Sequence, residues 1–491
     1  PIIRVLGVPL PNGEYLMYGI KIIRNHELSL TRQICDQLRK SIETGNLKCG
    51  ERLPSTRQMA RELNVSRNVV LEVYEQLTAE GYLESRVGSG TYVAGNINRK
   101  SNNGINATVH DHRGKIAHRK QKGADLIYFA SGIPDLKLFP GKIWSKYIKE
   151  AFLEEDQSLY SYGNISGDIR LRRVLTDYLF RLKGIQCTLE QILIVSGSSE
   201  GFILMAKVLS DTYNSVFVEE PTVNFIKNIF LDQGYTIKPV NVDDDGINTK
   251  ELEKEEERNL AIITPSHQFP TGSILTIQKR QRLIEFAERT DSFLVEDDYD
   301  SEFRLKGIPI PPLQVLNPSR VIYVGTFSKN CYPGLRLGFL VVPVQLLNKF
   351  MEVKRKLNMY TPMTKQRAMA GFIAGGHMER HIYTMKKIYK KRRELLHSLL
   401  VERFKNNIRI KGDETGMHLQ VEFTNPGLSN LDWDEAKKYG VEVDSFAEFC
   451  LNKGTNRNKI VLGYGNLSDN EIQEGVNRLY DFVHNKLPGR G

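Results

Sequence analysis

Between residues 29 and 94 the apolar positions follow the spacing of amphipathic helices and then alternate along strands. Ile34, Leu38 and Ile42 are four residues apart, so they share one face of a helix. Ser55 and Ser66 stand immediately before two further amphipathic segments, where a helix N-cap belongs. The pattern predicts helices at 30–43, 56–63 and 67 to about 80, then strands at 82–87 and 88–93 around a glycine turn.

From residue 125 onward, short apolar runs alternate with amphipathic segments. The runs with the length and composition of buried strands are 192–195, 215–218, 259–264, 293–298 and 321–324. Strands that alternate with helices, such as the one expected at 169–182, form an open and mostly parallel α/β sheet. A helix near 380–405 and strands at 417–423 and 459–464 predict a smaller C-terminal α+β part. We therefore expect residues 125–491 to form one large domain.

One lysine, one arginine and two hydroxyl residues follow the apolar run at 321–324. Thr326 and Ser328 precede Lys329, and Arg336 comes seven residues after that lysine. Taken alone, a Ser-Lys pair more often contains a solvated loop lysine. The alternative is a lysine that forms a Schiff base with pyridoxal phosphate (PLP), with the hydroxyls and Arg336 holding the phosphate.

The run at 293–298 supplies the acid that PLP chemistry requires. It ends in Asp297, and Tyr299 follows. A carboxylate beside the pyridine nitrogen favours the protonated ring, and the tyrosine can donate to the ring oxygen. A metal site or a polar strand end explains these carboxylates equally well when they are considered alone. In combination with Lys329 and Arg336 they indicate PLP binding.

A second phosphate-binding element is expected after the run at 192–195. Ser198 and Ser199 lie in a Gly/Ser loop that opens an apolar helix, and such a loop presents backbone N–H groups to an anion. Alone, this signal is weak. All the motifs of the large domain lie at carboxyl ends of predicted strands, which is where an α/β sheet binds its ligand.

Composition narrows the class of protein. The 491 residues are too many for a single core, so several domains are expected. No apolar run approaches the roughly 18 residues that span a bilayer, and no signal segment is apparent, so we expect a cytoplasmic protein without a membrane partner. The five cysteines are scattered and contain no C-x-x-C pair, which argues against disulfides and a structural metal site. Cys331 is either redox-sensitive or a packed thiol.

The predicted order of helix, helix, turn, helix and wing between 29 and 94 is that of a DNA-reading unit. The front of the third helix would enter the major groove, and Arg52 and Arg57 suit the phosphate backbone. The remaining candidate contacts are Ser66, Arg67 and Asn68 on the helix and Gly88, Gly90 and Thr91 on the wing. A small helical cap with a surface hairpin is the alternative, and the low net charge of +2 over residues 1–94 favours it slightly.

Residues 95–124 show little periodicity and read as a linker. They hold seven basic residues against one acid, a net charge of +6 within the +10 of the chain. This charge either keeps the linker soluble or adds contacts to DNA phosphates. Residues 1–28 form an irregular extension, with a possible strand at 18–24.

The motifs of both parts resemble those of known families. The stretches 52–57, 65–68 and 74–83 resemble the winged helices of GntR-type repressors. Residues 125–480, through 264–272, 296–303 and 325–329, resemble fold-type I, aspartate-aminotransferase-like PLP proteins. The two in this order resemble the MocR (GabR-like) family of bacterial transcription regulators.

The resemblance implies roles for single residues and for the whole protein. Lys329 matches the Schiff-base lysine, Asp297 the partner of the pyridine nitrogen and Tyr299 the partner of the ring oxygen. The phosphate cup matches Ser198, Ser199, Thr326, Ser328 and Arg336. His267 is expected at the mouth of the site. Arg457 is expected to bind the effector carboxylate, although it is alternatively a surface residue in a polar loop.

The resemblance also implies assembly and regulation. A homodimer is expected, with DNA-binding heads exchanged over the partner's large domain, and a small amino compound as effector. One departure is apparent: relatives that respond to γ-aminobutyrate have a tyrosine and an arginine where this chain has Val223 and Phe225. γ-Aminobutyrate is therefore not the expected effector. A ligand with one carboxylate held by Arg457, or PLP itself, fits better.

Three functions remain in competition. The first is a PLP-dependent transcription regulator, which the DNA-reading unit favours. The second is an aminotransferase with a DNA-binding appendage, because the core catalytic groups are present. The third is a plain repressor whose large domain only dimerises, which would make the residues around Lys329 coincidental. Repeated turnover of an amino donor and a 2-oxo acceptor distinguishes the second from the first.

Overall fold

The computed structural model describes residues 8–9, 15–17, 20–24, 28–86, 88–95, 126–154, 156, 159–305, 310–412, 415–452 and 454–486. The chain divides into two compact units, Pro1–His118 and Arg119–Gly491, called here the N-terminal unit and the large unit. The linker predicted at 95–124, apart from Gly95, and most of the extension at 1–28 lie outside the described residues.

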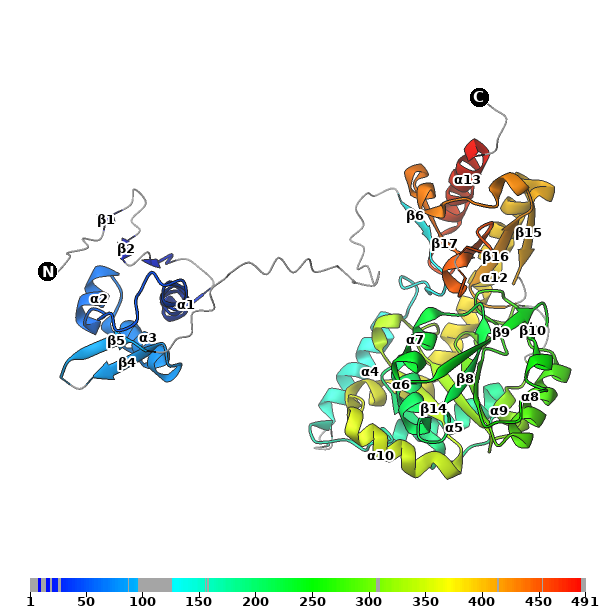
Figure 1. The fold of residues 1–491 in the computed structure, drawn as a ribbon, viewed down its shortest axis with the longest axis horizontal. Coiled ribbons are helices and arrows are strands. Elements are labelled where there is room, and N and C mark those ends of the chain that lie inside the picture. The colour runs from blue at the N-terminus through cyan, green and yellow to red at the C-terminus, as the bar shows by residue number, and fades with distance from the viewer. Residues whose placement is uncertain are drawn as a thin grey trace. The chain divides into compact units, whose positions relative to one another are not determined.

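The N-terminal unit is a three-helix winged unit, as the sequence predicts. Its helices are α1 (Leu30–Glu43), α2 (Thr56–Glu62) and α3 (Arg67–Ala79), and the antiparallel pair β4 (Leu83–Arg86) and β5 (Gly90–Val93) forms the wing (Figure 1). Short strands β1 (Val8–Pro9), β2 (Tyr15–Met17) and β3 (Ile20–Lys21) precede them. Of the strand predicted at 18–24, residues 18 and 19 lie outside the described residues, 20 and 21 form β3, and 22–24 are not in a strand.

Serine N-caps and a small apolar core hold this unit together. The hydroxyls of Ser29, Ser55 and Ser66 each accept the backbone N–H three residues later, which satisfies one free donor at the start of each helix. Leu38 of α1 and Val73 of α3 are fully buried in the shared core. The predicted four-residue spacing therefore marks the faces that meet.

The centre of the large unit is an eight-stranded sheet in the order β10-β9-β8-β11-β12-β13-β14-β7. β9, β8, β11, β12 and β13 are parallel neighbours, whereas β14 runs antiparallel between β13 and β7. The strands are β7 (Ile192–Val195), β8 (Ser215–Glu220), β9 (Thr236–Asp243), β10 (Gly246–Ile247), β11 (Leu260–Ile263), β12 (Phe293–Asp298), β13 (Val321–Thr326) and β14 (Gly338–Val341). This confirms the predicted, mostly parallel sheet.

Helices cover both faces of this sheet, because successive strand residues point to opposite sides. Val295 of β12 packs in the cluster formed with α6, α7 and α10, whereas Leu294 packs with α8 and α9. The helices are α4 (Gly141–Leu153), α5 (Ile169–Lys183), α6 (Ser198–Leu209), α7 (Asn224–Asp232), α8 (Ile277–Arg289), α9 (Leu313–Leu316), α10 (Leu347–Leu357) and α11 (Met363–Ala374). Figure 1 shows this layered arrangement.

The smaller part of the large unit is built from both ends of its chain. Its sheet has the order β15-β16-β18-β17-β6, with strands β15 (Ile408–Lys411), β16 (His418–Phe423), β17 (Val441–Ser445), β18 (Lys459–Gly463) and β6 (Ile127–Phe129). β6 pairs in parallel with β17. The long helix α12 (His377–Phe404) and the last helix α13 (Asp469–Lys486) pack on this sheet. The predicted C-terminal α+β part is thus completed by residues that open the large unit.

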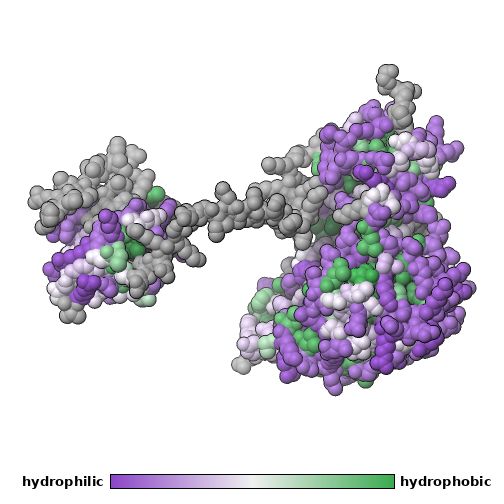
Figure 2. Space-filling view, in the orientation of Figure 1, coloured by the Kyte–Doolittle hydropathy of each residue, from purple (hydrophilic) through white to green (hydrophobic). Residues whose placement is uncertain are grey.

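On the face shown in Figure 2 the surface of the large unit is mostly hydrophilic, with hydrophobic residues gathered in smaller areas. Within the described ranges, every helix is too short or too polar to cross a bilayer.

A buried ion pair joins two helices on one side of the sheet. The Lys354 Nζ atom of α10 lies 2.6 Å from the Glu200 Oε1 atom in the first turn of α6, and Lys354 is fully buried. Burial alone would raise the pKa of Glu200, but Lys354 holds it below its ordinary value. Removing one partner of such a pair leaves an uncompensated buried charge.

We therefore expect Lys354→Ala to lower the free energy of unfolding of the large unit by about 3–5 kcal/mol. The control is Lys356→Ala on the same helix, because the Lys356 side chain is 72% exposed in its pair with Glu352. It should cost less than about 1 kcal/mol. Both tryptophans, Trp144 and Trp433, lie in the large unit, so urea unfolding followed by tryptophan fluorescence measures this unit alone. Equal effects of the two variants would contradict the prediction.

Candidate cofactor site and DNA interface

Lys329 lies just beyond the carboxyl end of β13 with its amine held against the opening segment of the large unit. The Nζ atom donates to the Gly132 carbonyl oxygen at 2.5 Å. A Cβ atom at position 132 would lie 2.8 Å from Nζ, so this approach needs a glycine. Burial lowers the pKa of Lys329, while Asp300 and Asp297 oppose the shift. A lowered pKa increases the fraction of the neutral, nucleophilic amine.

Asp297 occupies the end of the neighbouring strand β12, in register with Val324 of β13. Burial raises the pKa of Asp297 to about 7, and the carboxylates of Asp298 and Glu219 add to this, with Lys329 opposing. A cationic ring nitrogen placed here would restore the charged carboxylate. A positively charged group beside Asp297 would therefore lower the pKa of this carboxyl.

The Tyr299 hydroxyl is positioned by hydrogen bonds to His267. The Tyr299 hydroxyl donates to the His267 carbonyl oxygen at 2.9 Å and lies 3.1 Å from His267 Nδ1, which is itself 2.9 Å from Asp300 Oδ2. The His267 ring stacks on His418 at 4.6 Å. A Cβ atom on Gly416 would come within 2.0 Å of the His267 ring, so the packing leaves no spare room.

The expectation that His267 lies at the mouth of the site is wrong. Its side chain is 1% exposed and does not line the cavity that Tyr299 lines. The contact between His267 Nδ1 and Asp300 Oδ2 holds the ring inward, behind the tyrosine. His267 therefore positions Tyr299.

The opposite end of the site is suited to a phosphate. Gly197, the N-cap of α6, has a φ of +93°, and a Cβ atom there would meet the Arg336 guanidinium at 3.0 Å. Arg336 follows β13 by way of a short turn and itself adopts the left-handed conformation. Its charge thus lies against the loop that opens α6. The hydroxyl groups around this end are those of Ser198, Ser199, Thr326 and Ser328.

These groups line one cavity of about 370 Å³. The amine, the carboxylate, the phenol and the phosphate-binding groups match, in turn, the aldehyde, ring nitrogen, ring oxygen and phosphate of PLP. The residues of the cofactor prediction that the structure brings together are Lys329, Asp297, Tyr299, Ser198, Ser199, Thr326, Ser328 and Arg336. The donor set and the two glycine contacts fit this cofactor.

Arg457 is not brought to this cavity. Its side chain is exposed and lines a separate hollow with Asp432 and Trp433, whose Nε1 donates to the Arg457 carbonyl oxygen at 2.7 Å. The expectation that Arg457 holds an effector carboxylate in the site therefore lacks the geometry it needs. The position of Arg457 in a polar loop could be predicted, but the side on which its side chain lies could not.

Several residues at or next to the site were not singled out from the sequence. Phe269 and Phe449 line the cavity, yet Phe449 belongs to a short turn of the smaller part, far along the chain. Glu219 is fully buried beneath the site, where it accepts the Thr264 backbone N–H at 3.2 Å and the Thr264 hydroxyl. Its position in a Glu-Glu-Pro stretch was the available signal.

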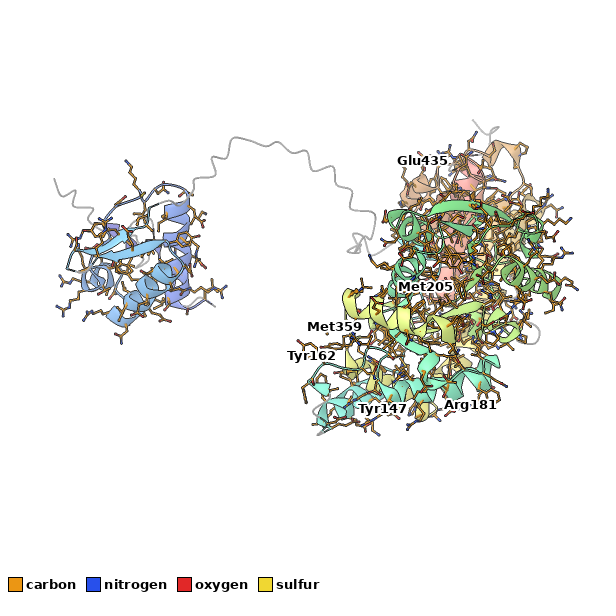
Figure 3. The ribbon with its side chains drawn as sticks, turned by 60° about the horizontal axis from the view of Figure 1, so that its bottom comes forward. Tyr147, Tyr162, Arg181, Met205, Met359 and Glu435 are labelled. Atoms are coloured by element: carbon orange, nitrogen blue, oxygen red, sulfur yellow. The ribbon has the colours of Figure 1, made fainter. Side chains whose placement is uncertain are left out.

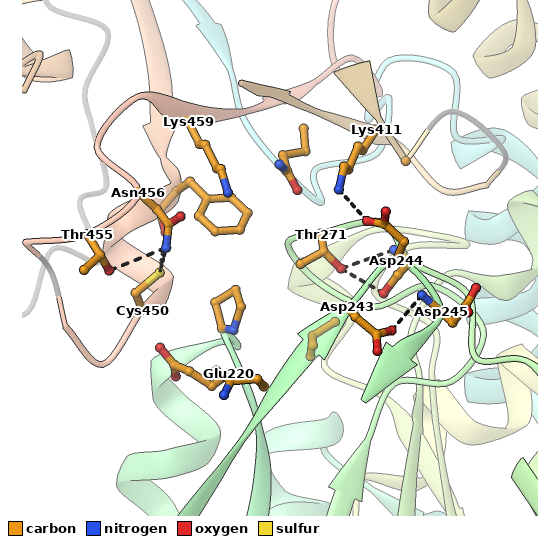
Figure 4. A pocket seen from close by; sticks show the side chains of 18 of the residues that line it. Glu220, Asp243, Asp244, Asp245, Thr271, Lys411, Cys450, Thr455, Asn456 and Lys459 are labelled. Carbon is orange, nitrogen blue, oxygen red and sulfur yellow. Dashed lines mark hydrogen bonds and ion pairs between the residues drawn. The ribbon is translucent and has the colours of Figure 1, made fainter. Parts of the chain in front are cut away.

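A larger cavity of about 780 Å³ lies between the β9–β10 edge and the smaller sheet (Figure 4). Its charges are largely paired: Asp244 with Lys411, and Asp243 with Lys279 at 2.5 Å. Glu220 accepts the Leu451 backbone N–H at 2.6 Å. The lysine, the phenol and the hydroxyl cup all line the smaller cavity, so chemistry and not size identifies the candidate cofactor site.

In the N-terminal unit, the predicted recognition residues are exposed together at the start of α3. Ser66, Arg67 and Asn68 are consecutive and exposed. The Ser66 hydroxyl accepts the Val69 N–H at 3.3 Å, so it is already engaged as the helix cap. The Arg67 Nε donates to the Thr56 hydroxyl at 3.4 Å, which links the recognition helix to α2.

The wing residues lie beside the predicted backbone contacts. Arg52 pairs through its backbone with Tyr92 of β5, and a Cβ atom on Gly90 would meet the Arg52 side chain at 3.0 Å. Gly88 and Gly90 have positive φ angles of +73° and +117°. The turn of the wing thus depends on both glycines. Arg57 is exposed on α2, and Thr91 is half-buried on β5.

Two family models match the chain. The model of aminotransferase class I and II matches residues 124–479, and the model of bacterial regulatory proteins, gntR family, matches residues 30–93. The chain is 34% identical to the probable rhizopine catabolism regulatory protein MocR of Rhizobium meliloti, over 93% of this chain and 94% of that protein. It is 28% identical to the pyridoxine biosynthesis regulator PdxR of Corynebacterium glutamicum, over 93% and 97%.

Solved structures resemble the large unit. The kynurenine aminotransferase of Pyrococcus horikoshii is 28% identical, with a TM-score of 0.68, and covers 74% of this chain and 92% of its own. The multiple substrate aminotransferase of Thermococcus profundus is 25% identical, with a TM-score of 0.67, and covers 74% and 93%.

The large unit is thus a fold-type I domain of the aminotransferase class I and II family, a fold that binds PLP. The chain as a whole belongs to the MocR family of GntR-type transcription regulators, in which a DNA-binding gntR domain precedes this domain.

The buried carboxyls of the site give a pH dependence to the cofactor-free protein. Burial raises the pKa of Glu219 from its ordinary value of 4.5 to about 7. The folded form therefore holds its proton more tightly than the unfolded chain does. This contribution to stability is complete below about pH 4.5 and is lost as the pH rises through about 7.

Through Glu219, the wild-type protein should lose about 3 kcal/mol of stability between pH 4.5 and 7. We expect Glu219→Gln to lack this loss, because glutamine does not titrate. The measurement is the free energy of unfolding against pH, by tryptophan fluorescence. Glu394→Gln, at a side chain that is 57% exposed, is the control and should keep the wild-type slope. An unchanged slope for Glu219→Gln would show that this carboxyl does not carry the effect.

Proposed function

We propose that this regulator holds PLP in the cavity of its large unit and couples the state of that site to operator binding by its N-terminal unit. The observation that carries the proposal is the convergence on one cavity of an amine, a carboxylate, a phenol and a phosphate cup from three separate stretches of the chain, 198–199, 297–299 and 326–336. A domain used only for dimerisation has no need of this set.

In this proposal, each residue has one task. PLP, when bound, supplies an aldehyde that condenses with amines and a ring that withdraws electrons. Lys329 holds the cofactor covalently, and its lowered pKa favours that reaction. Asp297 would keep the ring nitrogen protonated. Tyr299 would donate to the ring oxygen in place of its hydrogen bond to the His267 carbonyl oxygen. Arg336 and the hydroxyls bind the phosphate.

We further propose that residues 29–94 form the DNA-binding domain, 95–124 a basic linker and 125–491 the sensing and dimerisation domain. DNA phosphates are contacted by Arg52, Arg57 and the wing at Gly88, Gly90 and Thr91, whereas Arg67 and Asn68 reach base edges. Operator binding places the protein in the cytoplasm.

A homodimer is supported by exposed apolar side chains on the large unit. Phe152 and Leu153 at the end of α4 are 52% and 68% exposed, and Tyr160 and Tyr162 nearby in sequence are 71% and 77% exposed. Tyr162 and Met359 both project at the same edge of the large unit (Figure 3). Such a group of exposed apolar side chains is typical of an interface. Exchange of the DNA-binding heads is part of the same proposal.

The effector is a small amino compound or PLP itself. The name of the PdxR relative refers to pyridoxine biosynthesis and that of the MocR relative to rhizopine catabolism, which is compatible with either. Val223 and Phe225 line the cavity, which argues against γ-aminobutyrate. A second candidate function is transamination, which the complete set around Lys329 favours. Repeated conversion of an amino donor with a 2-oxo acceptor would establish it.

We expect Lys329→Ala to bind the operator within about threefold of wild type but to lose its response to the effector, because the covalent anchor is gone. The measurements are operator mobility shifts and the visible cofactor band before and after borohydride. Lys349→Ala, a partly exposed lysine in the same domain, is the control. A full effector response in Lys329→Ala would contradict the proposed sensing role.

We expect Arg67→Ala to weaken specific operator binding by about 1–3 kcal/mol, because it removes a major-groove contact. Helix α3 should still fold, since its Ser66 cap remains. Lys40→Ala on α1 removes the same charge from an exposed position away from the recognition helix and should have the smaller effect. Equal losses would refute the assignment of α3 as the reading helix.

A further inference from the structure

Besides the cofactor groups, the cavity is lined by four apolar side chains that have no role in holding the cofactor. Val223 and Phe225 at the start of α7 line it, together with Phe269 and Phe449. The rings of Phe269 and Phe449 meet edge to face, with centroids 4.8 Å apart. Phe225 packs edge to face on Phe202 at 6.1 Å and is still 42% exposed.

This apolar wall is fixed by hydrogen bonds between two segments of the large unit. The Phe449 carbonyl accepts the Thr222 backbone N–H at 3.1 Å. The Asn224 side chain donates to the Glu448 carbonyl at 2.6 Å, and Glu220 accepts the Leu451 N–H at 2.6 Å. The turn that carries Phe449 is therefore hydrogen-bonded to the loop between β8 and α7. These hydrogen bonds hold the two parts of the apolar wall together.

The described residues that line the cavity carry positive charge only where the cofactor is expected to be held. Among the described residues that line it, the cations are Lys329 and Arg336, and both belong to the cofactor set. Arg457 lines a different hollow. A ligand carboxylate placed against Val223, Phe269 and Phe449 would lose its hydration without gaining an ion pair, which is unfavourable.

We propose that the effector is a small primary amine whose remaining part is uncharged and apolar, with an aryl or branched alkyl group resting on this wall. The inference rests on the proposed function, since the amine is recognised through the cofactor site. The proposed ligand class of the site is amines without a carboxylate, which should bind more tightly than amino acids. The cavity of about 370 Å³ has to hold cofactor and effector together, which limits the effector to a small molecule.

The test uses the full-length protein loaded with PLP and two probes that differ by one carboxylate, 2-phenylethylamine and L-phenylalanine. The readouts are the shift of the visible cofactor band and the change in operator affinity as each probe is titrated. We expect 2-phenylethylamine to act at a concentration at least about tenfold lower than L-phenylalanine. Equal or tighter action of L-phenylalanine, or no response to either probe in a protein that shows the cofactor band, would overturn the inference.

A charge placed in the wall should change this preference. Phe225→Arg is chosen because the partly exposed position can accommodate the longer side chain, and it should lower the preference for 2-phenylethylamine at least about tenfold. Leu231→Arg, on the same helix at a position that is 52% exposed and does not line the cavity, is the control and should keep the wild-type ratio. An unchanged ratio in Phe225→Arg would contradict the role of the wall.

Failure of this inference is distinguishable from failure of the proposed function. If the wild-type protein shows no cofactor band after PLP is added, the cofactor site itself is wrong. If the band forms but the carboxylate makes no difference, the cofactor site stands and the proposed ligand class falls.

Discussion

The structure of the large unit depends on how four carboxyl groups are accommodated at one end of the central sheet. Asp298 is neutralised by Lys183 at 3.1 Å, and Asp300 pairs with His267 at 2.9 Å. Glu219 is held by Thr264 and keeps its proton to about pH 7. Lys329 lowers the pKa of Asp297 but does not offset the effect of burial, so this pKa is raised to about 7. A cationic ring nitrogen beside Asp297 would therefore stabilise the charged form of this carboxyl.

The same accommodation explains why the surroundings of the site are so tightly specified. The contact between Asp300 and His267 holds the His267 ring behind Tyr299, and the His267 ring and Asp300 together require Gly416 to lack a side chain. At the other end, Arg336 requires the glycine at 197. Residues distant in the sequence are thus constrained by the packing around a few charges.

Much of this could be predicted from the sequence, because the relevant groups follow apolar runs directly. Parallel strands bring their carboxyl ends to one edge, so Asp297 and Lys329 had to meet. Directions of loop residues could not be predicted in this way. Arg457 lines a separate hollow. His267 lies inward because it contacts Asp300, and the sequence does not distinguish Asp300 from the neighbouring carboxylates. Phe449 and β6 reach their places through tertiary contacts that leave no local pattern.

The most direct test of a covalent cofactor at Lys329 is to load the protein with PLP, reduce it with borohydride and locate the added mass by peptide mass spectrometry. We expect a visible absorbance band before reduction and the cofactor mass on the peptide that contains Lys329. Absence of the band, or the mass on another lysine, would contradict this expectation and leave a DNA-binding protein whose aminotransferase fold serves another purpose.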